Sequence, residues 1–202
     1  MVNHNTFYKA VVKSFADRLI ALFALVILLP LFVLVAVLIK LDSNGPVFFR
    51  QNRLGRNGTI FRIYKFRSMK LHTLGKTGTK LFENDPRITR VGKYIRKTSI
   101  DELPQLLNVI KGEMSFIGPR PPVTYFPKEY KDYTEFEKQR FLVKPGISGL
   151  AQTRCREIHD WDINIPIDVE YVINYSFTLD MKLFLSSILS FFRTDNIYRE
   201  QN

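Results

Sequence analysis

The chain has 202 residues, of which 46% are hydrophobic, and its formal net charge is +11. This length suits a single domain that buries a core. The single cysteine, Cys155, excludes an internal disulfide and fits a reducing compartment, and we interpret it as an inert small side chain. The sequence has no internal repeat and no low-complexity tract.

The N-terminal part predicts association with a membrane. Residues 1–18 carry apolar side chains at helical spacing, which predicts an interfacial helix. The next segment, residues 20–39, is a run of 20 residues without a polar side chain, long enough to cross a bilayer core of about 30 Å as a helix. A signal peptide has a shorter apolar region and a cleavage site after it. A buried helix of a soluble protein is a poorer explanation of apolarity on all sides.

Pro30 lies in the middle of this run, where it removes a backbone hydrogen bond and bends a helix. Positive charge marks the cytoplasmic side of a membrane helix. Here both flanks carry it, at Lys9, Lys13 and Arg18 before the run and at Lys40, Arg50, Arg53 and Arg56 after it. A re-entrant helical hairpin, which enters and leaves by one face, explains this pattern better than a span.

The next segment is strongly basic and contains a predicted β-hairpin. Residues 40–97 hold 15 Lys and Arg against three acids, a net charge of +12. Anionic lipid beside the membrane segment is a better partner for this charge than nucleic acid, so no nucleic acid is expected. Residues 47–53 and 59–67 are rich in aromatic and β-branched side chains around a Gly-Arg-Asn-Gly loop, which predicts a hairpin. Residues 71–86 are expected to form a polar loop.

The segment from residue 85 to residue 121 carries the strongest chemical signal. Asp101 and Glu102 follow a run of cations and precede a Gly-Pro-Arg-Pro turn that ends at Pro121. Carboxylates among cations suit chemistry on a phosphate, since one acid attacks or binds metal while arginines neutralise phosphoryl oxygens. The cations are Arg87, Arg90, Lys93, Arg96 and Lys97.

A structural interpretation of the same acids is a capping box, in which Ser99 and Glu102 satisfy the free amides of a helix start. Pro104 disfavours helical geometry at Leu103, so the helix is expected to begin at Asp101 or later. One of the two acids would then be free for other work.

The C-terminal part is expected to be helical. Residues 130–141 predict a charged surface helix that ends before Pro145, and residues 168–174 predict a short helix. Residues 179–192 carry apolar side chains toward one side, which fits either a core helix or a second helix at the membrane interface.

The segment 85–121 resembles the signature of the bacterial sugar transferases, the monotopic phosphoglycosyl transferases. The resemblance extends over nearly the whole chain in the family's order, and it favours the interface for residues 179–192. The other segments that carry it are 45–51 (GPVFFRQ), 64–69 (YKFRSM), 144–152 (KPGISGLAQ) and, more weakly, 168–180.

The resemblance implies transfer of a phospho-sugar from a UDP-sugar to a polyprenyl phosphate such as undecaprenyl phosphate, with release of UMP. Asp101 would be the nucleophile that forms a covalent phospho-sugar intermediate, and Mg²⁺ would be the cofactor, with Asp101 and Glu102 as its protein ligands. Magnesium takes few protein ligands beside substrate phosphates, so no His or Cys cluster is required.

The resemblance also assigns residues to substrate binding. Arg96 would contact phosphate, Pro119, Arg120 and Pro121 would lie at the nucleotide end, and Arg156 would be a later basic residue of the site. A solvated helix face for Arg96 and an ordinary surface position for Arg120 are the structural alternatives. This chain departs from the family at Cys155, where Gly is common, and at Leu29, where Ser often precedes Pro30.

We therefore expect an α/β, mostly helical monotopic membrane protein with a Pro-broken re-entrant hairpin, a small β-hairpin and interfacial amphipathic helices. Residues 1–40 would form the membrane part and residues 41–202 a catalytic domain on the cytoplasmic face of the bacterial inner membrane. Membrane lipids and downstream glycosyltransferases would be its partners. The alternatives are a non-catalytic basic membrane adaptor and a glycosyltransferase that releases UDP.

Overall fold

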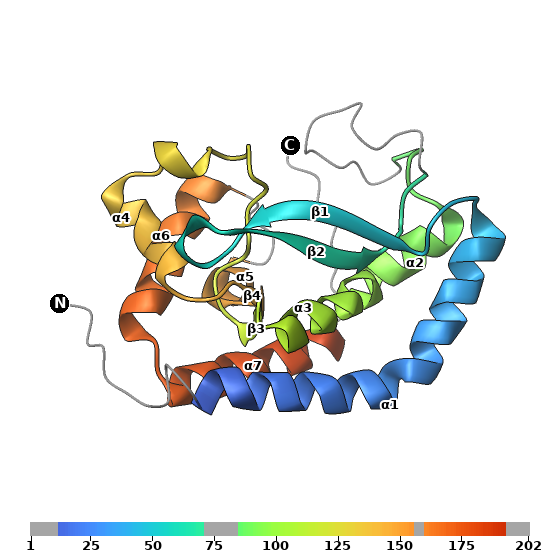
Figure 1. Ribbon diagram of the computed structural model, residues 1–202, viewed down its shortest axis with the longest axis horizontal. Coiled ribbons are helices and arrows are strands. Elements are labelled where there is room, and N and C mark those ends of the chain that lie inside the picture. The colour runs from blue at the N-terminus through green and yellow to red at the C-terminus, as the bar shows by residue number, and fades with distance from the viewer. Residues whose placement is uncertain (1–11, 71–84, 156–159, 193–202) are drawn as a thin grey trace.

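The computed structural model describes residues 12–70, 85–155 and 160–192 (Figure 1). These residues are mostly helical with a small two-stranded antiparallel sheet, as the sequence predicts in outline. A short parallel strand pair, which the sequence does not predict, is also present. The main elements are α1 (Lys13–Asp42), β1 (Phe48–Leu54), β2 (Ile60–Phe66), α2 (Arg90–Lys97), the 3-10 helix η4 (Ile100–Gln105), α3 (Leu106–Lys111), β3 (Ser115–Ile117), β4 (Gly146–Ser148), α5 (Leu150–Arg154), α6 (Trp161–Asn174) and α7 (Phe177–Phe192).

Helix α1 contains the whole predicted apolar run and bends near its middle, where Pro30 lies in the sequence (Figure 1). The helix continues through the proline, so the structure has a bent helix where the sequence predicts a broken hairpin. Among the described residues it is the one helix long and apolar enough to cross a membrane, and only 17% of its most apolar 18-residue window is buried. A core helix of a soluble protein would be mostly buried.

The two halves of α1 pack against different parts of the protein. Ala21 in the first half is fully buried against α3, in a cluster that also contains Val109. In the second half, Phe32 and Ile39 pack against the end of β2, where the Phe32 and Phe66 rings meet edge to face at 5.0 Å. The bend at Pro30 therefore separates two buried contacts.

The antiparallel hairpin forms as predicted, with Phe48 opposite Phe66 and Leu54 opposite Ile60. Asn57 and Gly58 adopt positive φ angles of 55° and 75° in the connecting turn, a conformation that Gly and Asn adopt at low cost.

Asn108 of α3 fastens the hairpin to the helix beneath it. Its buried side chain accepts a hydrogen bond from the Tyr64 backbone N–H (3.0 Å). It also donates to the Arg62 carbonyl and the Glu113 carboxylate, both at 2.7 Å. The Asn108 side chain thus bonds to backbone groups at this edge of β2 with which a third strand would otherwise pair.

The C-terminal half differs from the sequence prediction in detail. The single helix expected over residues 130–141 is three short pieces: η5 (Tyr130–Asp132), α4 (Glu135–Lys138) and η6 (Gln139–Leu142). The cause is Thr134, which starts a new helix through a capping box with Glu137. The helix expected over residues 168–174 begins earlier, at Trp161, because Asp160 caps it.

Helix α7 corresponds to the apolar helix expected near the C-terminus. It buries Leu183 in a core cluster, while Phe177 and Leu185 on its other side are 57% and 54% exposed. It therefore combines one buried side with one apolar exposed side. The predictions for residues 1–11 and 71–84 lie outside the described residues.

Asn108→Ala should destabilise the fold, because it leaves the Tyr64 N–H and the Arg62 carbonyl without their partner. The expected loss is about 1–3 kcal/mol, which lowers the midpoint of thermal unfolding by roughly 2–4 °C for each kcal/mol. Thermal unfolding in a mild detergent measures it. Asn52→Ala, at an exposed position of the same hairpin, is the matched control and should shift the midpoint little. Equal midpoints for the two variants would contradict the role of Asn108.

Candidate active site

The predicted catalytic acids lie on η4, a short 3-10 helix between α2 and α3. The alternative capping box does not form: Ser99 has a φ of 53° and its side chain caps nothing, while its backbone N–H bonds to the Arg96 carbonyl (3.1 Å). Ser99 thus ends α2, and its carbonyl accepts the Glu102 backbone N–H (3.1 Å) at the start of η4 without a side-chain cap. Glu102 takes no part in capping. The predicted helix start at Asp101 or later is wrong, because the 3-10 helix η4 begins at Ile100 and runs through Leu103 and Pro104, and the α-helix follows only at Leu106.

Asp101 is nearly buried, with 8% of its surface exposed, and it makes no hydrogen bond or ion pair with the residues that the structure describes. Burial raises the pKa of Asp101 to about 6, and the charge of Glu102 adds to this effect while Lys65 and Arg96 oppose it. With a pKa of about 6, the carboxylate is about nine-tenths ionised at pH 7. Its oxygens therefore carry negative charge and make no hydrogen bond or ion pair with the described residues. A nucleophile or a metal ligand requires both properties.

Glu102 has the opposite surroundings. Its carboxylate oxygen Oε1 lies 2.5 Å from Lys65 Nζ and 3.7 Å from a guanidinium nitrogen of Arg120. Burial alone would raise the pKa of Glu102, but Lys65 and Arg120 outweigh it and lower the pKa to about 2. Glu102 therefore stays ionised and holds two cations beside Asp101.

Lys65 and Arg53 belong to this site, although the sequence analysis gave them no role there. Lys65 follows Phe61 and Ile63 on the side of β2 that faces the core, since alternate residues of a strand share a face. A lysine in register with buried apolar residues is a signal that could have identified it. Arg53 donates to the Pro121 carbonyl (3.0 Å), and burial lowers its pKa to about 10, as does the neighbouring charge of Arg120.

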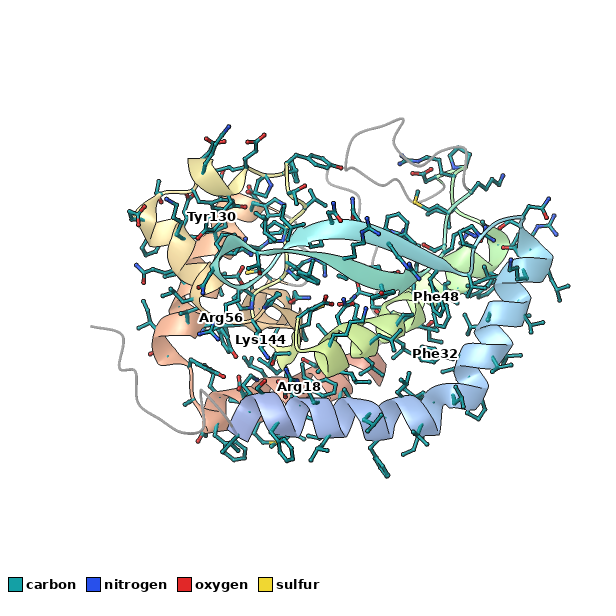
Figure 2. All side chains as sticks on the ribbon, in the orientation of Figure 1. Arg18, Phe32, Phe48, Arg56, Tyr130 and Lys144 are labelled. Atoms are coloured by element: carbon teal, nitrogen blue, oxygen red, sulfur yellow. The ribbon has the colours of Figure 1, made fainter. Side chains whose placement is uncertain are left out.

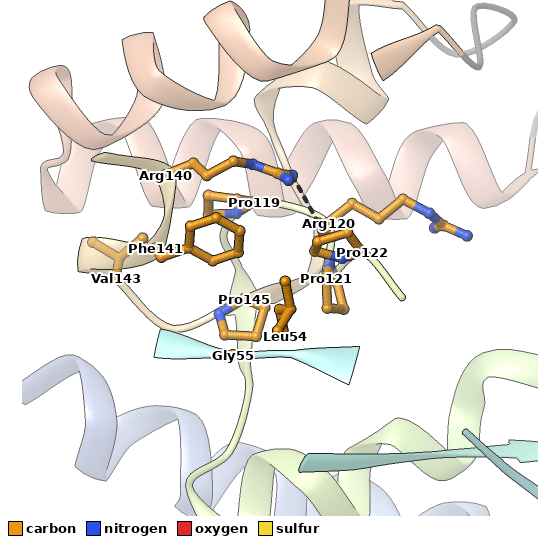
Figure 3. A pocket seen from close by; sticks show the side chains of 10 residues that line it. All are labelled: Leu54, Gly55, Pro119, Arg120, Pro121, Pro122, Arg140, Phe141, Val143 and Pro145. Carbon is orange, nitrogen blue, oxygen red and sulfur yellow. Dashed lines mark hydrogen bonds between the residues drawn. The ribbon is translucent and has the colours of Figure 1, made fainter. Parts of the chain in front are cut away.

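The Gly-Pro-Arg-Pro turn brings Arg120 to the acids. Figure 3 shows its side chain pointing away from an apolar hollow behind the turn, which Phe141 and Pro145 help to line. On the other side, a second hollow is bordered by Arg53, Lys65, Glu102, Gln105, Arg120 and Pro121. Lys65, Glu102 and Arg120 in this second hollow are charges that act on Asp101, so we assign the candidate site to it.

A buried ion pair supports this turn from behind. Arg140 donates to the Arg120 carbonyl at 2.9 Å and to the Asp168 carboxylate at 2.5 Å, and both charged side chains are almost fully buried. Sequence reasoning did not identify Arg140. Breaking such a pair leaves an uncompensated buried charge, so it fixes the turn that carries Arg120.

The structure describes all but one of the remaining predicted site residues. Arg96 bonds weakly to the Ser68 hydroxyl (3.4 Å), and its charge acts on Asp101, so it belongs to the site's surroundings. Pro119 and Pro121 flank Arg120 in the turn, whereas Arg156 lies outside the described residues. Pro30 lies in α1 and has no part in the acid cluster.

The donor atoms present fit a magnesium ion, which needs few protein ligands, better than a metal whose ligands all come from the protein. No group of three or more His, Cys, Asp or Glu side chains with metal-binding spacing occurs within residues 12–70, 85–155 and 160–192. Asp101 offers uncommitted oxygens, and Glu102 offers its second oxygen next to it. Two carboxylates suffice for Mg²⁺, which takes its other ligands from water and substrate phosphates.

The chain is similar to known bacterial sugar transferases over most of its length. The family model described as bacterial sugar transferase matches residues 8–194. One relative, the UDP-N-acetylgalactosamine-undecaprenyl-phosphate N-acetylgalactosaminephosphotransferase of Aeromonas hydrophila, is 44% identical over 89% of this chain and 43% of its own length. Galactosyl transferase CpsE of Streptococcus agalactiae serotype III is 43% identical over 90% of this chain and 43% of its own.

This chain thus spans about two fifths of the length of those two relatives. The exopolysaccharide production protein PSS of Rhizobium leguminosarum bv. phaseoli is 41% identical, and that match covers 89% of this chain and 94% of the relative. The family match runs through every predicted site residue and most of the sequence. The chain therefore belongs to the bacterial sugar transferase family.

Proposed function

We propose that this chain transfers a sugar phosphate from a UDP-sugar to a polyprenyl phosphate and releases UMP. The observation that carries the proposal is the uncommitted, nearly buried carboxylate of Asp101 beside Lys65 and Arg120. The Aeromonas relative's name supports it, since that name states transfer of N-acetylgalactosamine phosphate to undecaprenyl phosphate. The streptococcal relative is named for galactose, so relatives differ in the sugar.

The first half-reaction is an attack by Asp101. A carboxylate oxygen forms a bond to the phosphorus that bears the sugar, and the bond from that phosphorus to the oxygen shared with the uridine phosphate breaks. UMP leaves with that electron pair, and the sugar phosphate remains on Asp101 as an acyl phosphate. A polyprenyl phosphate oxygen then attacks the same phosphorus and frees the carboxylate.

The surrounding cations supply the electrostatic part of this chemistry. Negative charge develops on the phosphate oxygens and on departing UMP, and prealigned cations in a water-poor site stabilise it more than bulk water does. Glu102 fixes Lys65 by a 2.5 Å ion pair, and Arg140 fixes the backbone of Arg120. Lys65 and the backbone of Arg120 are thus held in place before substrate binds.

Magnesium is the proposed cofactor, held by Asp101 and Glu102. When bound, it would neutralise charge on the diphosphate. Glu102 and Asp101 are adjacent on one 3-10 turn, and Glu102 lines the hollow that Lys65 and Arg120 also border.

We further propose that α1 enters the membrane and returns to the same face. Both ends of the helix are bonded to the same body: Asp17 accepts from Ser115 (2.5 Å), and Asp42 accepts from the Val91 backbone N–H (2.9 Å). A helix tied at both ends to one body on one side of a membrane cannot cross it. The body would lie on the cytoplasmic face of the bacterial inner membrane, where downstream glycosyltransferases would use the product.

Asp101→Asn should abolish turnover, because an amide oxygen is a far weaker nucleophile than a carboxylate. We expect UMP release from a panel of UDP-sugars, with undecaprenyl phosphate and Mg²⁺, to fall by at least about a thousandfold. Asp132→Asn, at an exposed position, is the matched control and should keep normal rates. Near-normal release by the Asp101 variant would refute the nucleophile, and UDP among the products would favour transfer of sugar alone.

Glu102→Gln should be impaired in a way that depends on magnesium. The substitution removes a charge that holds Lys65 and contributes to the proposed metal site, so the rate should fall at least about tenfold and the Mg²⁺ requirement should rise. Titration of UMP release with Mg²⁺ measures both effects. An unchanged half-saturating Mg²⁺ concentration would remove Glu102 from the metal site.

The re-entrant arrangement predicts that both ends of α1 face the same compartment. In a Cys155→Ser background, Val12→Cys and Asn44→Cys place a thiol at an exposed position near each end. A membrane-impermeant maleimide should label neither in intact spheroplasts and both in inverted vesicles. Labelling of one thiol from each side would show a spanning helix and end this part of the proposal.

A further inference from the structure

A second group of cations lies between the first half of α1, the β1–β2 turn and the segment before β4. Figure 2 shows Arg56, Lys144 and Arg18 following one another from that turn down to α1. Lys144 donates to the Ser14 hydroxyl at 2.7 Å, and Ser14 and Arg18 share a face of α1, being four residues apart. The three cations thus come together from separate parts of the chain.

The guanidinium of Arg18 also reaches the end of α3. A Cβ added at Gly112 would clash with Arg18 Nη2, so the guanidinium lies against this glycine. Gly112 has a φ of 80°, which favours glycine in any case. The position of Arg18 is therefore defined by contact with the body.

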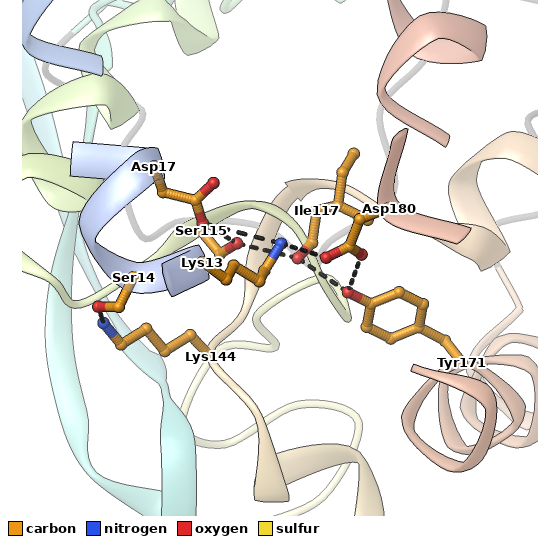
Figure 4. Close-up of polar contacts among 8 residues, drawn as sticks. All are labelled: Lys13, Ser14, Asp17, Ser115, Ile117, Lys144, Tyr171 and Asp180. Atoms are coloured by element: carbon orange, nitrogen blue, oxygen red, sulfur yellow. Dashed lines mark hydrogen bonds and ion pairs between the residues drawn. The ribbon is translucent and has the colours of Figure 1, made fainter. Parts of the chain in front are cut away.

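The nearby carboxylates are occupied by other partners (Figure 4). Asp180 accepts from Lys13 at 2.7 Å and from the Tyr171 hydroxyl at 2.6 Å. Asp17 accepts from Ser115 and lies 3.7 Å from Lys13. Within the described residues, no carboxylate forms an ion pair with Arg18, Arg56 or Lys144.

The cations act on one another. Burial lowers the pKa of Lys144, and so do the charges of Arg18, Arg56 and Lys13, while Asp17 opposes them. Like charges held close together raise the free energy of the folded state unless a counter-ion joins them. A bound anion would relieve this repulsion.

We propose that Arg18, Arg56 and Lys144 bind the phosphate of a membrane lipid headgroup. The position of Arg18 favours a lipid as the source of the phosphate. Its neighbours Phe15 and Leu19 on α1 are 65% and 51% exposed, so the cation borders the apolar surface of the helix. A lipid phosphate stands at that same border between hydrocarbon and water, where long cationic side chains settle.

Lipid binding at this site would also fix how deeply the protein lies in the membrane. The site holds the first half of α1 at the phosphate layer, and it lies on residues that take no part in the acid cluster on η4. The inference does not rest on the proposed transfer reaction, because its test measures binding without turnover.

The test uses the full chain in dodecyl maltoside, a detergent without phosphate or charge. Dihexanoyl phosphatidylglycerol below its micelle concentration is the probe, and the midpoint of thermal unfolding is the readout, since a ligand of the folded state raises it. Wild-type protein should show a rise that saturates. R18Q/K144Q should need at least about tenfold more lipid for the same rise, an equilibrium change of about 1.4 kcal/mol.

The control R62Q/K182Q removes the same amount of charge at exposed positions elsewhere and should respond as wild type does. Should R18Q/K144Q fail to fold, R56Q on the exposed turn should still need at least about threefold more lipid. Wild-type responses in these variants would overturn the proposal. Dihexanoylglycerol, which lacks phosphate, should have no effect, and an equal response to inorganic phosphate would reassign the site to free phosphate.

Discussion

The ion pair between Lys65 and Glu102 connects η4, which carries the proposed nucleophile, to the hairpin and through it to the apolar helix α1. It joins η4 to β2 across 2.5 Å with both side chains largely buried, so the loss of either partner would leave a charge in a poorly solvated place. The next residue of β2, Phe66, packs on Phe32 of α1. Arg67 then donates to carbonyls at the end of α1, including that of Ser43 at 2.6 Å. Glu102, the β1–β2 hairpin and the C-terminal end of α1 are therefore held in fixed positions relative to one another.

Two neighbouring acids receive different roles from their surroundings. Glu102 faces Lys65 and Arg120 and is held at a pKa of about 2, whereas burial raises the pKa of Asp101 to about 6. Pairs of acids whose environments separate their pKa values recur at catalytic sites. The acid tied to the cations organises the site, and the uncommitted acid is available to react.

The sequence predicts the features that depend on local pattern and misses those that depend on tertiary contacts. Apolar periodicity and turn residues sufficed for the β-hairpin, and Pro30 marked the bend of α1. The capping box at Ser99 was a reasonable local interpretation, but Ser99 takes a left-handed conformation that ends α2. Lys65 and Arg140 escaped notice because their importance arises from partners 37 and 28 residues away.

The attachment of α1 at both ends has a consequence for the proposed chemistry. In the proposed reaction a soluble nucleotide sugar and a lipid-bound acceptor meet only near the membrane surface, so the proposed nucleophile would have to be held at a fixed height above the hydrocarbon. A flexible tether would let that height vary, and small displacements at a reacting centre cost large factors in rate. Here Ala21 in the first half of α1 and Ile39 in the second are both buried against the body that carries Asp101. The bend at Pro30 makes this double attachment geometrically accessible, because a straight helix of 30 residues would extend about 45 Å and carry its far end away from the body.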